Sequence, residues 1–346
     1  MGTTYRLDAC YPDPGTNHSP ECKNFTREMP AGALMTNARL RGTIGSNSEK
    51  ATQAIVNIID GARKNPYGEV FDNSHLRSNL LAIISANAPL RVVLPLFHGK
   101  CSSRRFTIGD LPDYAEYLAV ETLAELQGRI AEVYSDTTFF LISEGHFHAE
   151  VDHFIGSEQI IDDYARGIRE MLASYPALVF KDTDELLPGM THEQQRRILL
   201  EQYSPDDDQT RFLMLTDDRL LALYRSYTKL HFKLITDNSL AESSGRQQRG
   251  RAKQRALLQL RKYVGFSRLL GAAFGPDPYV KLSPLYKTPA QSDQLGINVI
   301  SGIHTLGTTS FNAACKTRAG ISLLSAEEAR RAGYRLVQGP YPFFEE

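Results

Sequence analysis

The chain has 346 residues, which is enough for one large domain or two ordinary ones with a sizeable buried core. Its 39 basic and 40 acidic residues nearly cancel, so we expect no global attraction to nucleic acid or to an anionic membrane, and any electrostatic partner must bind a local patch. No apolar run is long enough to cross a bilayer, the four cysteines form no CxxC pair, and the N-terminus lacks the features of a signal peptide. These features predict a cytoplasmic protein with free thiols.

The chain is predicted to begin with an irregular arm that leads into helices and a strand. Residues 1–45 are rich in Pro, Gly, Asn and Thr and have no sustained hydrophobic period, which indicates an extended arm. Residues 48–64 and 74–86 carry apolar residues at three-to-four spacing and are predicted helices. The Val- and Leu-rich run PLRVVLPLF at 89–97 is short and bounded by prolines, which predicts a buried strand in a covered, mostly parallel sheet.

A βαβ unit is predicted next, because a strong helical pattern lies between β-rich runs. Residues 110–134 have one apolar face and a proline suited to a first helical turn, and TTFFLIS at 137–143 follows as a strand. A second helix at 157–175 and a strand at 177–182 continue the alternation. Strands joined by such crossovers are parallel.

This alternation predicts an α/β fold with a Rossmann-like, open and largely parallel sheet flanked by helices. The sheet and its helices are expected over residues 46–185, and residues 186–346 are expected to be a helical and β C-terminal portion that completes the active site. Reactive groups gather at the carboxyl ends of parallel strands. The loops that start at Phe97 and Ser143 are therefore predicted to face the same crevice.

The C-terminal portion begins with charged helices and ends with β-forming runs. Residues 182–275 are predicted to be helical, and residues 246–268 contain eight Lys or Arg and no acid. On composition alone, a solvated helix face is favoured for this basic stretch over an anion-binding site. From Tyr279 onward, clusters of β-formers between turn residues predict an antiparallel or mixed sheet.

The loop after the first predicted strand has the composition of a phosphate-binding loop. Three cations, two hydroxyls and free backbone N–H groups can hold a phosphate by charge and by hydrogen bonds. It is not a Walker loop, because the glycines and the Lys-Ser/Thr pair of that motif are missing. We expect its lysine to be a loop cation that contributes to anion binding and not to the core. The residues concerned are Lys100, Ser102, Ser103, Arg104 and Arg105.

The stretch FFLISEGHFHAEVDHF, after the second predicted strand, concentrates histidines and carboxylates. On an extended segment alternate side chains point the same way, so His146, His148 and Glu150 could share a side, with His153 near them. No spacing here matches a helix-borne HExxH, and we favour polar surface over a metal site. Glu144 and Glu150 are better interpreted as acid–base candidates, because proton transfer needs a titratable group beside the reacting atom.

Both stretches resemble motifs of the isocyanide (isonitrile) synthase family, which includes the pyoverdine and dityrosine biosynthesis proteins. FHGKCSSRRFTIGDLPDYAE is similar to the family pattern Phe-Pro-x-Lys-Ser-Pro-Asn followed by Gly-x-Leu-Pro-Asp-x-x-Glu, and LISEGHFHAE to its Ser-Asp-Gly-x-x-Phe-x-Asp loop. Farther on, RAKQRALLQLRKYVGFSRLL resembles a basic family helix, and LGINVISGIHTLGTTSFNA resembles its glycine-rich strand and Thr-Pro-Trp-His segment. The resemblance runs in order from about residue 85 to the C-terminus, as expected for a divergent member.

The resemblance implies an enzyme of natural-product biosynthesis that uses no metal or organic cofactor. Such an enzyme condenses the amino group of an amino acid, usually tyrosine or tryptophan, with the ketone of ribulose 5-phosphate. The C2 atom of the sugar becomes the isonitrile carbon. An aromatic amino acid is therefore a candidate substrate, and a downstream oxygenase is a candidate partner in the same pathway.

The resemblance also carries roles onto individual residues. Lys100, Glu144 and Glu150 match a lysine and two aspartates of the family and are expected to be catalytic; each glutamate is one methylene longer than the aspartate it replaces. The phosphate and carbonyl chemistry agrees with this, since an anionic sugar requires cations and imine formation requires proton carriers. The remaining matched positions are Gly109, Leu111, Pro112, Asp113, Glu116, Gly145, Arg255, Ser267, Lys281 and Ser283, of which Asp113, Arg255, Ser267, Lys281 and Ser283 are expected to bind substrate.

The departures from the family pattern leave three alternatives open. Asn312, expected to bind substrate, stands where the family has a histidine, and Pro-Leu at 284–285 replaces a family Ile-His. His146, His148 and His304 are candidates for the missing imidazole, and His146 is counted with the catalytic residues. The chain is thus interpreted as an isonitrile synthase, as a relative that makes a different one-carbon or condensation product from an amino acid, or as a non-catalytic binding protein on the same fold.

Overall fold

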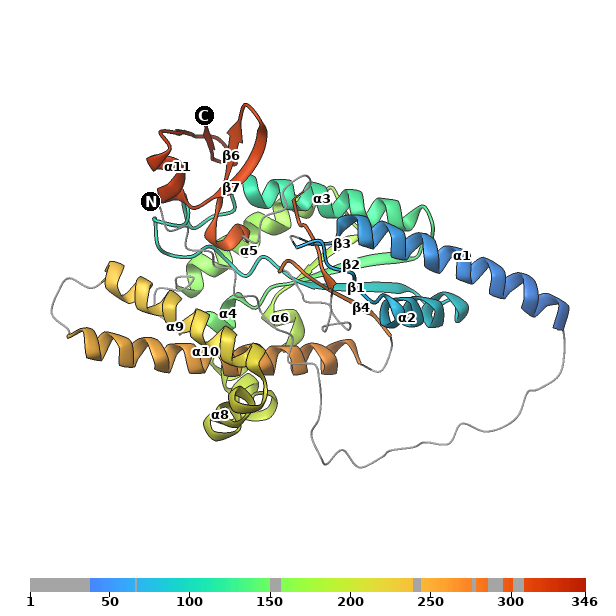
Figure 1. Cartoon of the computed structure of the whole chain (residues 1–346), viewed down its shortest axis with the longest axis horizontal. Helices are drawn as coiled ribbons and strands as arrows, with labels where there is room; N and C mark the ends of the chain where they lie inside the picture. The colour runs from blue at the N-terminus through green and yellow to red at the C-terminus, as the bar shows by residue number, and fades with distance from the viewer. Residues whose placement is uncertain are drawn as a thin grey trace.

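The structure is a computed structural model that combines a parallel sheet, a helical portion and a second, smaller sheet (Figure 1). It describes residues 38–65, 67–149, 157–238, 244–275, 278–285, 295–300 and 308–346.

The main sheet has five strands within the described residues, all parallel, in the order β3-β2-β1-β4-β5. The strands are β1 (Leu90–Pro95), β2 (Thr137–Ile142), β3 (Leu178–Lys181), β4 (Val280–Ser283) and β5 (Leu295–Gly296). The prediction of an α/β fold with an open, largely parallel sheet and flanking helices is confirmed. All strands run the same way, so their carboxyl ends lie along a single edge.

The sheet is covered on both faces, which explains the nearly continuous apolar sequence of β1. Leu90, Val92 and Leu94 pack into a core with helices α1 (Ala38–Ala62), α2 (Ser74–Ser85), α3 (Tyr114–Ala131) and α5 (Glu158–Leu172). Val93 points the other way, into a cluster with Phe266 and other apolar residues of the long helix α10 (Gly245–Phe274). Figure 1 shows α10 along one face of the sheet and α3 with α1 along the other.

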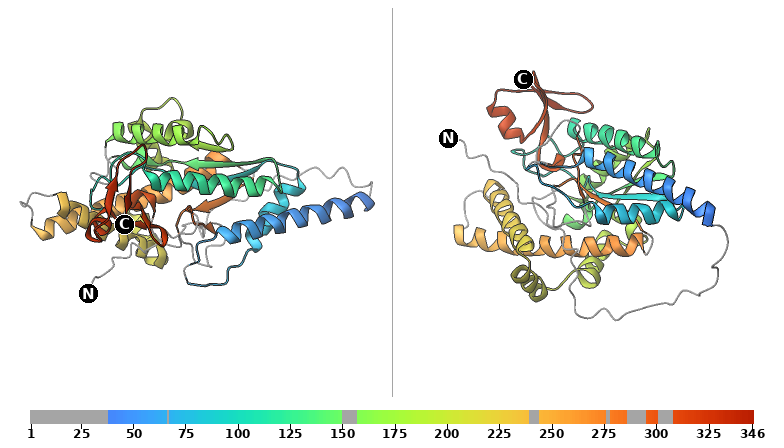
Figure 2. Two further views of the ribbon diagram at one scale, coloured as in Figure 1. Left: turned by 90° about the horizontal axis from the view of Figure 1, so that it is seen from above. Right: turned by 45° about the vertical axis from the view of Figure 1, so that its right-hand side comes forward.

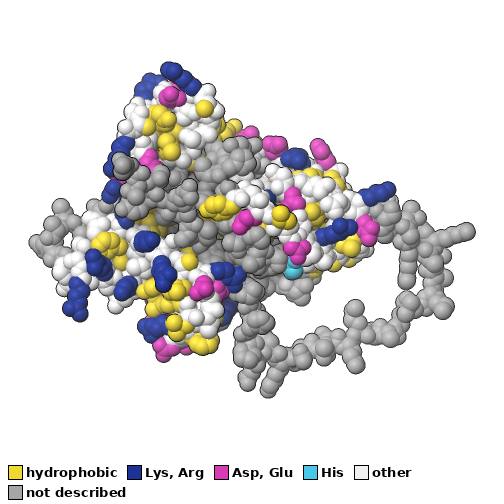
Figure 3. Space-filling view, viewed as in Figure 1, with side chains coloured by type: hydrophobic (Ala, Val, Ile, Leu, Met, Phe, Trp, Pro, Cys, Tyr) yellow, Lys and Arg dark blue, Asp and Glu magenta, His cyan; other side chains and the backbone are white. Residues whose placement is uncertain are grey.

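Helices fill the chain between β3 and β4. The elements are α6 (Thr183–Leu186), α7 (His192–Ile198), a π-helical turn (Leu199–Tyr203), α8 (Asp207–Thr216), α9 (Asp218–Asn238) and α10. Basic side chains gather on the α9–α10 hairpin (Figure 3). Arg246, Arg249, Arg251 and Lys253 are exposed, as predicted for a solvated face, whereas Lys262 is buried and donates to the carbonyl of Phe147. The first half of the basic stretch is therefore solvated, and in its second half Lys262 belongs to the core while Arg268 is exposed.

The C-terminal sheet stands near the beginning of α3 (Figures 1 and 2). Its strands are β6 (Ala313–Thr317), β7 (Gly320–Leu324), β8 (Arg335–Val337) and β9 (Phe343–Glu345), in the order β7-β6-β9-β8. The β6–β9 pair is parallel and the other two pairs are antiparallel, so this sheet is mixed, as predicted. The short helix α11 (Ala326–Arg331) begins at the capping box of Ser325 and Glu328 and packs beside it.

Two boundaries differ from the sequence-based expectation. Helix α1 begins at Ala38, so residues 38–45 are helical and not part of an irregular arm; residues 1–37 lie outside the described residues. β4 and β5 join the parallel sheet through β1, although their sequences were assigned to the antiparallel or mixed C-terminal sheet. Strand sequences indicate burial but not the partner, and here a partner far away in the chain completes the sheet.

Two further predictions concern thiols and membranes. Cys101 and Cys315 are buried thiols and form no disulfide within the part of the chain that the structure describes, as predicted. Cys10 and Cys22 lie outside it. Among the described residues, none of the helices combines the length and the apolar character that spanning a bilayer requires.

Candidate active site

The loops after β1 and β2 meet at the carboxyl edge of the sheet. The last residues of the two strands are in register, Pro95 with Ile142, and the Leu96 N–H donates to the Ile142 carbonyl at 3.0 Å. The first loop then turns sharply, because Phe97 has a φ of 61°, a left-handed value that is rare for a bulky residue. The prediction that these loops face one another is confirmed.

Gly145 is the point of closest approach between the loops. A Cβ atom there would lie 2.6 Å from the His98 carbonyl oxygen and 2.8 Å from a methyl group of Ile161. We expect Gly145→Ala to lower the free energy of unfolding by about 1–3 kcal/mol, because backbone cannot yield to the new atom. Denaturant unfolding measures this. Gly271→Ala is the matched control, since nothing lies within 4 Å of that position and alanine favours a helix; an equal loss in both variants would contradict the close packing of the loops.

Lys100 lies at the centre of a buried ion cluster. Its Nζ lies 2.9 Å from Asp113 Oδ2 and 2.7 Å from Glu116 Oε2, and donates to the Thr309 carbonyl at 2.8 Å. The Lys100 side chain is 0% exposed. The expectation that Lys100 is a loop cation outside the core is therefore wrong. Its three N–H groups already have partners, which leaves none for a phosphate.

The carboxylates of this cluster belong to the start of α3. Asp113 caps the helix by accepting from the Ala115 N–H at 2.8 Å, and Glu116 Oε2 accepts from the Asp113 N–H at 3.0 Å. Glu116 Oε1 also accepts from the Tyr164 hydroxyl at 3.2 Å. The family-like run Gly-x-Leu-Pro-Asp-x-x-Glu is thus a capping box whose two acids also bind Lys100. Asp113, expected to bind substrate, has these intramolecular partners.

If Asp113 and Glu116 were both ionised beside Lys100, the buried cluster would carry one uncompensated negative charge. Burial, opposed by Lys100 and reinforced by Asp113, raises the pKa of Glu116 to about 7. Burial alone would lower the pKa of Lys100, but Asp113 and Glu116 more than offset this, and the pKa is raised. The cluster therefore holds Lys100 charged and keeps Glu116 protonated up to near-neutral pH.

A second cluster joins the two loops around Glu144. His148 Nε2 lies 3.6 Å from Glu144 Oε2, the His148 and His98 rings are 6.3 Å apart, and His98 Nε2 lies 3.2 Å from Ser310 Oγ. Burial raises the pKa of Glu144, but the partners His148 and His98 outweigh it, and the pKa is lowered. Burial lowers the pKa of His98 to about 4. At neutral pH the cluster presents the ionised carboxylate of Glu144 and the neutral imidazole of His98, which is a competent arrangement for moving protons.

The two histidines after Glu144 do not share a side. Residues 145–148 form the short helix α4 (Gly145–His148), and positions two apart on a helix point to nearly opposite faces. His148 turns toward Glu144, whereas His146 Nε2 lies 3.1 Å from Asp162 Oδ1. The extended interpretation of this segment is therefore wrong. Glu150, His153 and His304 lie outside the described residues.

Helices α9 and α10 bring a third polar group toward His148. His231 Nε2 lies 2.7 Å from Gln259 Oε1, and burial lowers the pKa of His231 to about 4. Arg255 and His148 both act electrostatically on His231, so Arg255 lies in the neighbourhood of the Glu144 cluster. His98 and His231 were not selected from the sequence, because neither stands in a distinctive pattern.

The other predicted substrate-binding residues lie on β4 and in the turn before β6. Lys281 Nζ donates to Ser267 Oγ at 3.0 Å, and Ser283 Oγ accepts from the Leu285 N–H at 3.1 Å. Lys281 is in register with Val93 of β1, beside the edge that carries the loops. Asn312 donates to the Thr308 carbonyl at 2.8 Å, a local turn contact.

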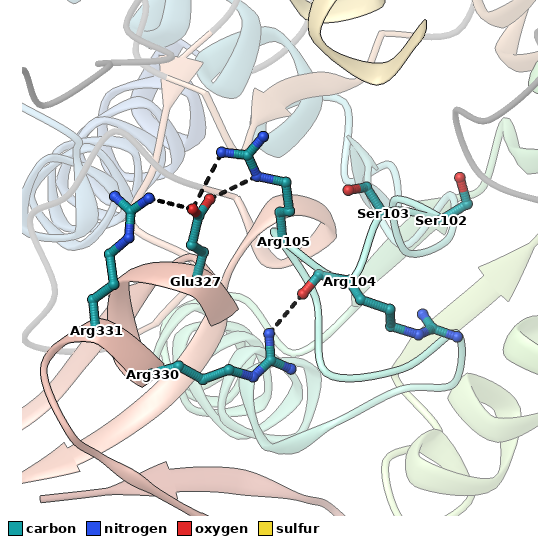
Figure 4. Close-up of a pocket in the computed structure, with 7 residues that line it drawn as sticks. All are labelled: Ser102, Ser103, Arg104, Arg105, Glu327, Arg330 and Arg331. Atoms are coloured by element: carbon teal, nitrogen blue, oxygen red, sulfur yellow. Dashed lines mark hydrogen bonds and ion pairs between the residues drawn. The ribbon is translucent and has the colours of Figure 1, made fainter. Parts of the chain in front are cut away.

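A basic pocket of about 700 Å³ opens where the first loop meets α11 (Figure 4). Arg105 Nε and Glu327 Oε2 are 2.7 Å apart, and the Arg330 guanidinium donates to the Arg104 carbonyl at 2.8 Å. The Arg104 side chain extends away from Glu327 to a bidentate pair with Asp110. The lining residues are Ser102, Ser103, Arg104, Arg105, Glu327, Arg330 and Arg331.

The structure thus divides the predicted phosphate loop in two. Ser102 to Arg105 face the pocket, and Lys100 belongs to the buried cluster. The four arginines exceed the acids Glu327 and Asp110, so the pocket favours an anion. The sequence carried no signal for the position of Arg330 and Arg331 against the loop.

A parallel sheet with buried carboxylates and histidines at its carboxyl edge is characteristic of α/β enzymes. The family model of the pyoverdine/dityrosine biosynthesis proteins matches residues 80–337. The chain belongs to this family, as the resemblance indicated.

Curated relatives and a solved structure agree with this assignment. The L-tyrosine isonitrile synthase of Xenorhabdus nematophila is 24% identical over 74% of this chain and 77% of the relative. The L-tryptophan isonitrile synthase of Fischerella ambigua is 23% identical over 74% and 79%, and the L-tyrosine isonitrile synthase of Pseudomonas aeruginosa 26% over 75% and 79%. The crystal structure of the PvcA protein of Pseudomonas aeruginosa superposes with a TM-score of 0.74 at 22% identity, covering 86% of this chain and 99% of that one, which shows a common fold. The prediction of an enzyme of the isonitrile synthase type is confirmed.

Proposed function

We propose that this chain condenses the amino group of an amino acid with the C2 ketone of ribulose 5-phosphate to form an isonitrile. C2 is retained as the isonitrile carbon, its bonds to C1 and C3 are broken, and the remaining carbons of the sugar phosphate are released. The observation that carries the proposal is the match of three isonitrile synthases, with tyrosine or tryptophan in their names, along about three quarters of the chain. An aromatic amino acid is accordingly the first substrate to test. The same test distinguishes the two alternatives, an enzyme that makes a different product and a binding protein without activity.

The Glu144 cluster is proposed to move the protons of the first step. An amine attacks a ketone only when it has lost its proton, and the resulting carbinolamine loses water to give an imine. Glu144 is ionised beside His148, and its side chain is 13% exposed, so it is both charged and accessible. His98 and His148 provide imidazoles that the family motif places elsewhere in the sequence.

The basic pocket is proposed to hold the sugar phosphate. Arginine guanidinium groups bind phosphate by charge and by paired hydrogen bonds. The loop that carries His98 beside the Glu144 cluster also carries Ser102 to Arg105 in the pocket, so the two sites are connected by a few residues. A five-carbon phosphate is an elongated ligand suited to such an arrangement.

The test of the reaction is mass spectrometry of purified protein incubated with ribulose 5-phosphate labelled with ¹³C at C2 and with individual amino acids. We expect an isonitrile that retains the label, and a roughly 100-fold or greater loss of kcat in Glu144→Gln with substrate affinity nearly unchanged. Glu121→Gln, an exposed glutamate of α3, is the matched control. A different labelled adduct would replace the proposed product, and no turnover with any amino acid would favour the binding protein.

The phosphate pocket has a separate test. Arg105→Met and Arg330→Met together are expected to raise KM for ribulose 5-phosphate about tenfold or more while kcat falls little, because the pocket contributes binding and not proton transfer. Arg335→Met removes an exposed arginine of β8 that pairs with Glu345 and serves as control. An unchanged KM in the double variant would place the phosphate outside this pocket.

A further inference from the structure

We propose that His146, Asp162 and His192 form a binding site for a divalent transition-metal ion such as Zn²⁺, which joins helices α4, α5 and α7 beside the candidate active site. The site stands apart from the proposed reaction and does not depend on it. In the sequence, the candidate metal ligands near His146 were His148, Glu150 and His153. The structure instead gives His146 two partners from distant parts of the chain.

The donor atoms of the three residues are already close. One ligand atom from each lies within 4.8 Å of the others, and His146 Nε2 is 3.1 Å from Asp162 Oδ1. The His146 and His192 rings stack with centroids 3.6 Å apart. Around a tetrahedral zinc ion with bonds of about 2.1 Å, ligand atoms are about 3.4 Å apart, so the separation of the donor atoms fits. Binding requires the stacked rings to turn so that their lone pairs point to one ion.

Two more carboxylates surround His192. Asp184 Oδ1 lies 3.3 Å from its Nε2, and Glu158 Oε2 lies 3.5 Å from its Nδ1. One ring nitrogen can bind a metal while the other keeps its carboxylate partner, which is the common way in which metal-binding histidines are oriented. The neighbouring carboxylates thus supply either a fourth ligand or the orienting partner.

The charge around the two histidines favours a cation. Asp162, Asp184 and Glu158 lie at the imidazoles, and the nearby Arg196 is engaged with Glu158 at 2.6 Å. Asp162 and Asp184 thus place negative charge at the two imidazoles, which a bound cation would balance.

His146 itself points to a missing ligand. Its ring is 2% exposed, and its Nδ1 has no hydrogen-bond partner among the residues that the structure describes. A buried imidazole nitrogen without a partner is unfavourable. A metal ion bound to Nδ1, with the proton on Nε2 toward Asp162, would give this nitrogen the partner that it lacks.

An ion here would fix the segment that carries Glu144 and His148. Helix α4 contains His146 and His148 and follows Glu144 directly, and α7 already contacts it through the Arg196 guanidinium, which donates to the His146 carbonyl at 3.3 Å. A bond from the ion to His146 would hold α4 against α5 and α7. His146 would then be a positioning residue rather than a proton carrier.

The test uses the full chain, freed of metal by a chelator and titrated with Zn²⁺ against a chromophoric competitor and with Co²⁺ by visible absorption. We expect one ion per chain, a tetrahedral Co²⁺ spectrum, and a melting temperature that rises by a few degrees at saturating Zn²⁺. His192→Ala and Asp162→Asn, at partly exposed positions that tolerate substitution, are each expected to weaken Zn²⁺ binding at least tenfold. Circular dichroism checks that both variants remain folded.

His75→Ala is the matched control, because His75 is an exposed histidine on α2, outside the cluster. Its Zn²⁺ affinity and melting shift should equal those of the parent protein. Absence of stoichiometric binding would overturn the proposal. Binding that survives in both folded variants would overturn it equally, since the ion would then be held elsewhere.

Discussion

Replacing Lys100 by methionine is expected to lower the free energy of unfolding by about 3–5 kcal/mol, more than any other single substitution considered. Methionine has nearly the same length, so the loss is not one of volume. It leaves the carboxyl groups of Asp113 and Glu116 buried without the cation that lies 2.9 and 2.7 Å from them. Denaturant unfolding followed by circular dichroism measures the change.

Arg104→Met is the control for this prediction. Arg104 is a cation of the same loop, but its pair with Asp110 is half exposed, so its loss should change the unfolding free energy by less than about 1 kcal/mol. An equal change in unfolding free energy in the two variants would contradict the conclusion that Lys100 compensates two buried carboxyl groups. Because Lys100→Met destabilises the fold, loss of activity in it would not identify a catalytic role.

Glu116→Gln is expected to remove a pH-dependent contribution to stability. The pKa of Glu116 is raised from 4.5 in the unfolded chain to about 7 in the folded protein, so the folded state binds this proton more tightly. The corresponding stabilisation is complete below pH 4.5 and is lost as the pH rises to about 7, by on the order of 3 kcal/mol. Glutamine mimics the protonated acid at every pH. The variant should therefore gain stability relative to the parent between pH 5 and pH 8.

The measurement compares unfolding free energies of parent and variant at several pH values, so that other titrating groups cancel. Glu121→Gln, on the exposed side of the same helix, controls for the exchange itself. A difference between parent and Glu116→Gln that stays constant from pH 5 to pH 8 would mean that Glu116 is ionised throughout this range. The two carboxylates would then both be charged around Lys100.

The sheet was predictable where its strands are joined by local crossovers. The apolar runs of β1, β2 and β3 and the helices between them follow one another directly, and their order fixes their pairing. β4 and β5 were placed in the wrong sheet, because β4 pairs with β1, a strand about 190 residues earlier in the chain, and β5 joins the sheet through β4. Periodicity indicates a strand but carries no information about such a partner.

In the candidate site, too, the features set by neighbouring residues were predictable, and those set by contacts between distant segments were not. The sequence located both loops correctly, since they follow adjacent strands, and Glu144 was among its candidates for proton transfer. It did not identify the burial of Lys100, which depends on α3 and on the Thr309 carbonyl, or the approach of His192 to His146, which depends on how α7 packs against α4. Burial and pairing are properties of the assembled fold, and they decide whether a charged residue binds a ligand or another residue.

The position of β4 between β1 and β5 has a consequence for synthesis on the ribosome. Until residue 280 has emerged, β1 has β2 on one side and an unpaired edge on the other. Unpaired edges invite association with other chains. The edge of β1 therefore stays unpaired until β4 has been synthesised. Conditions that slow elongation before residue 280 should increase aggregation of the nascent chain.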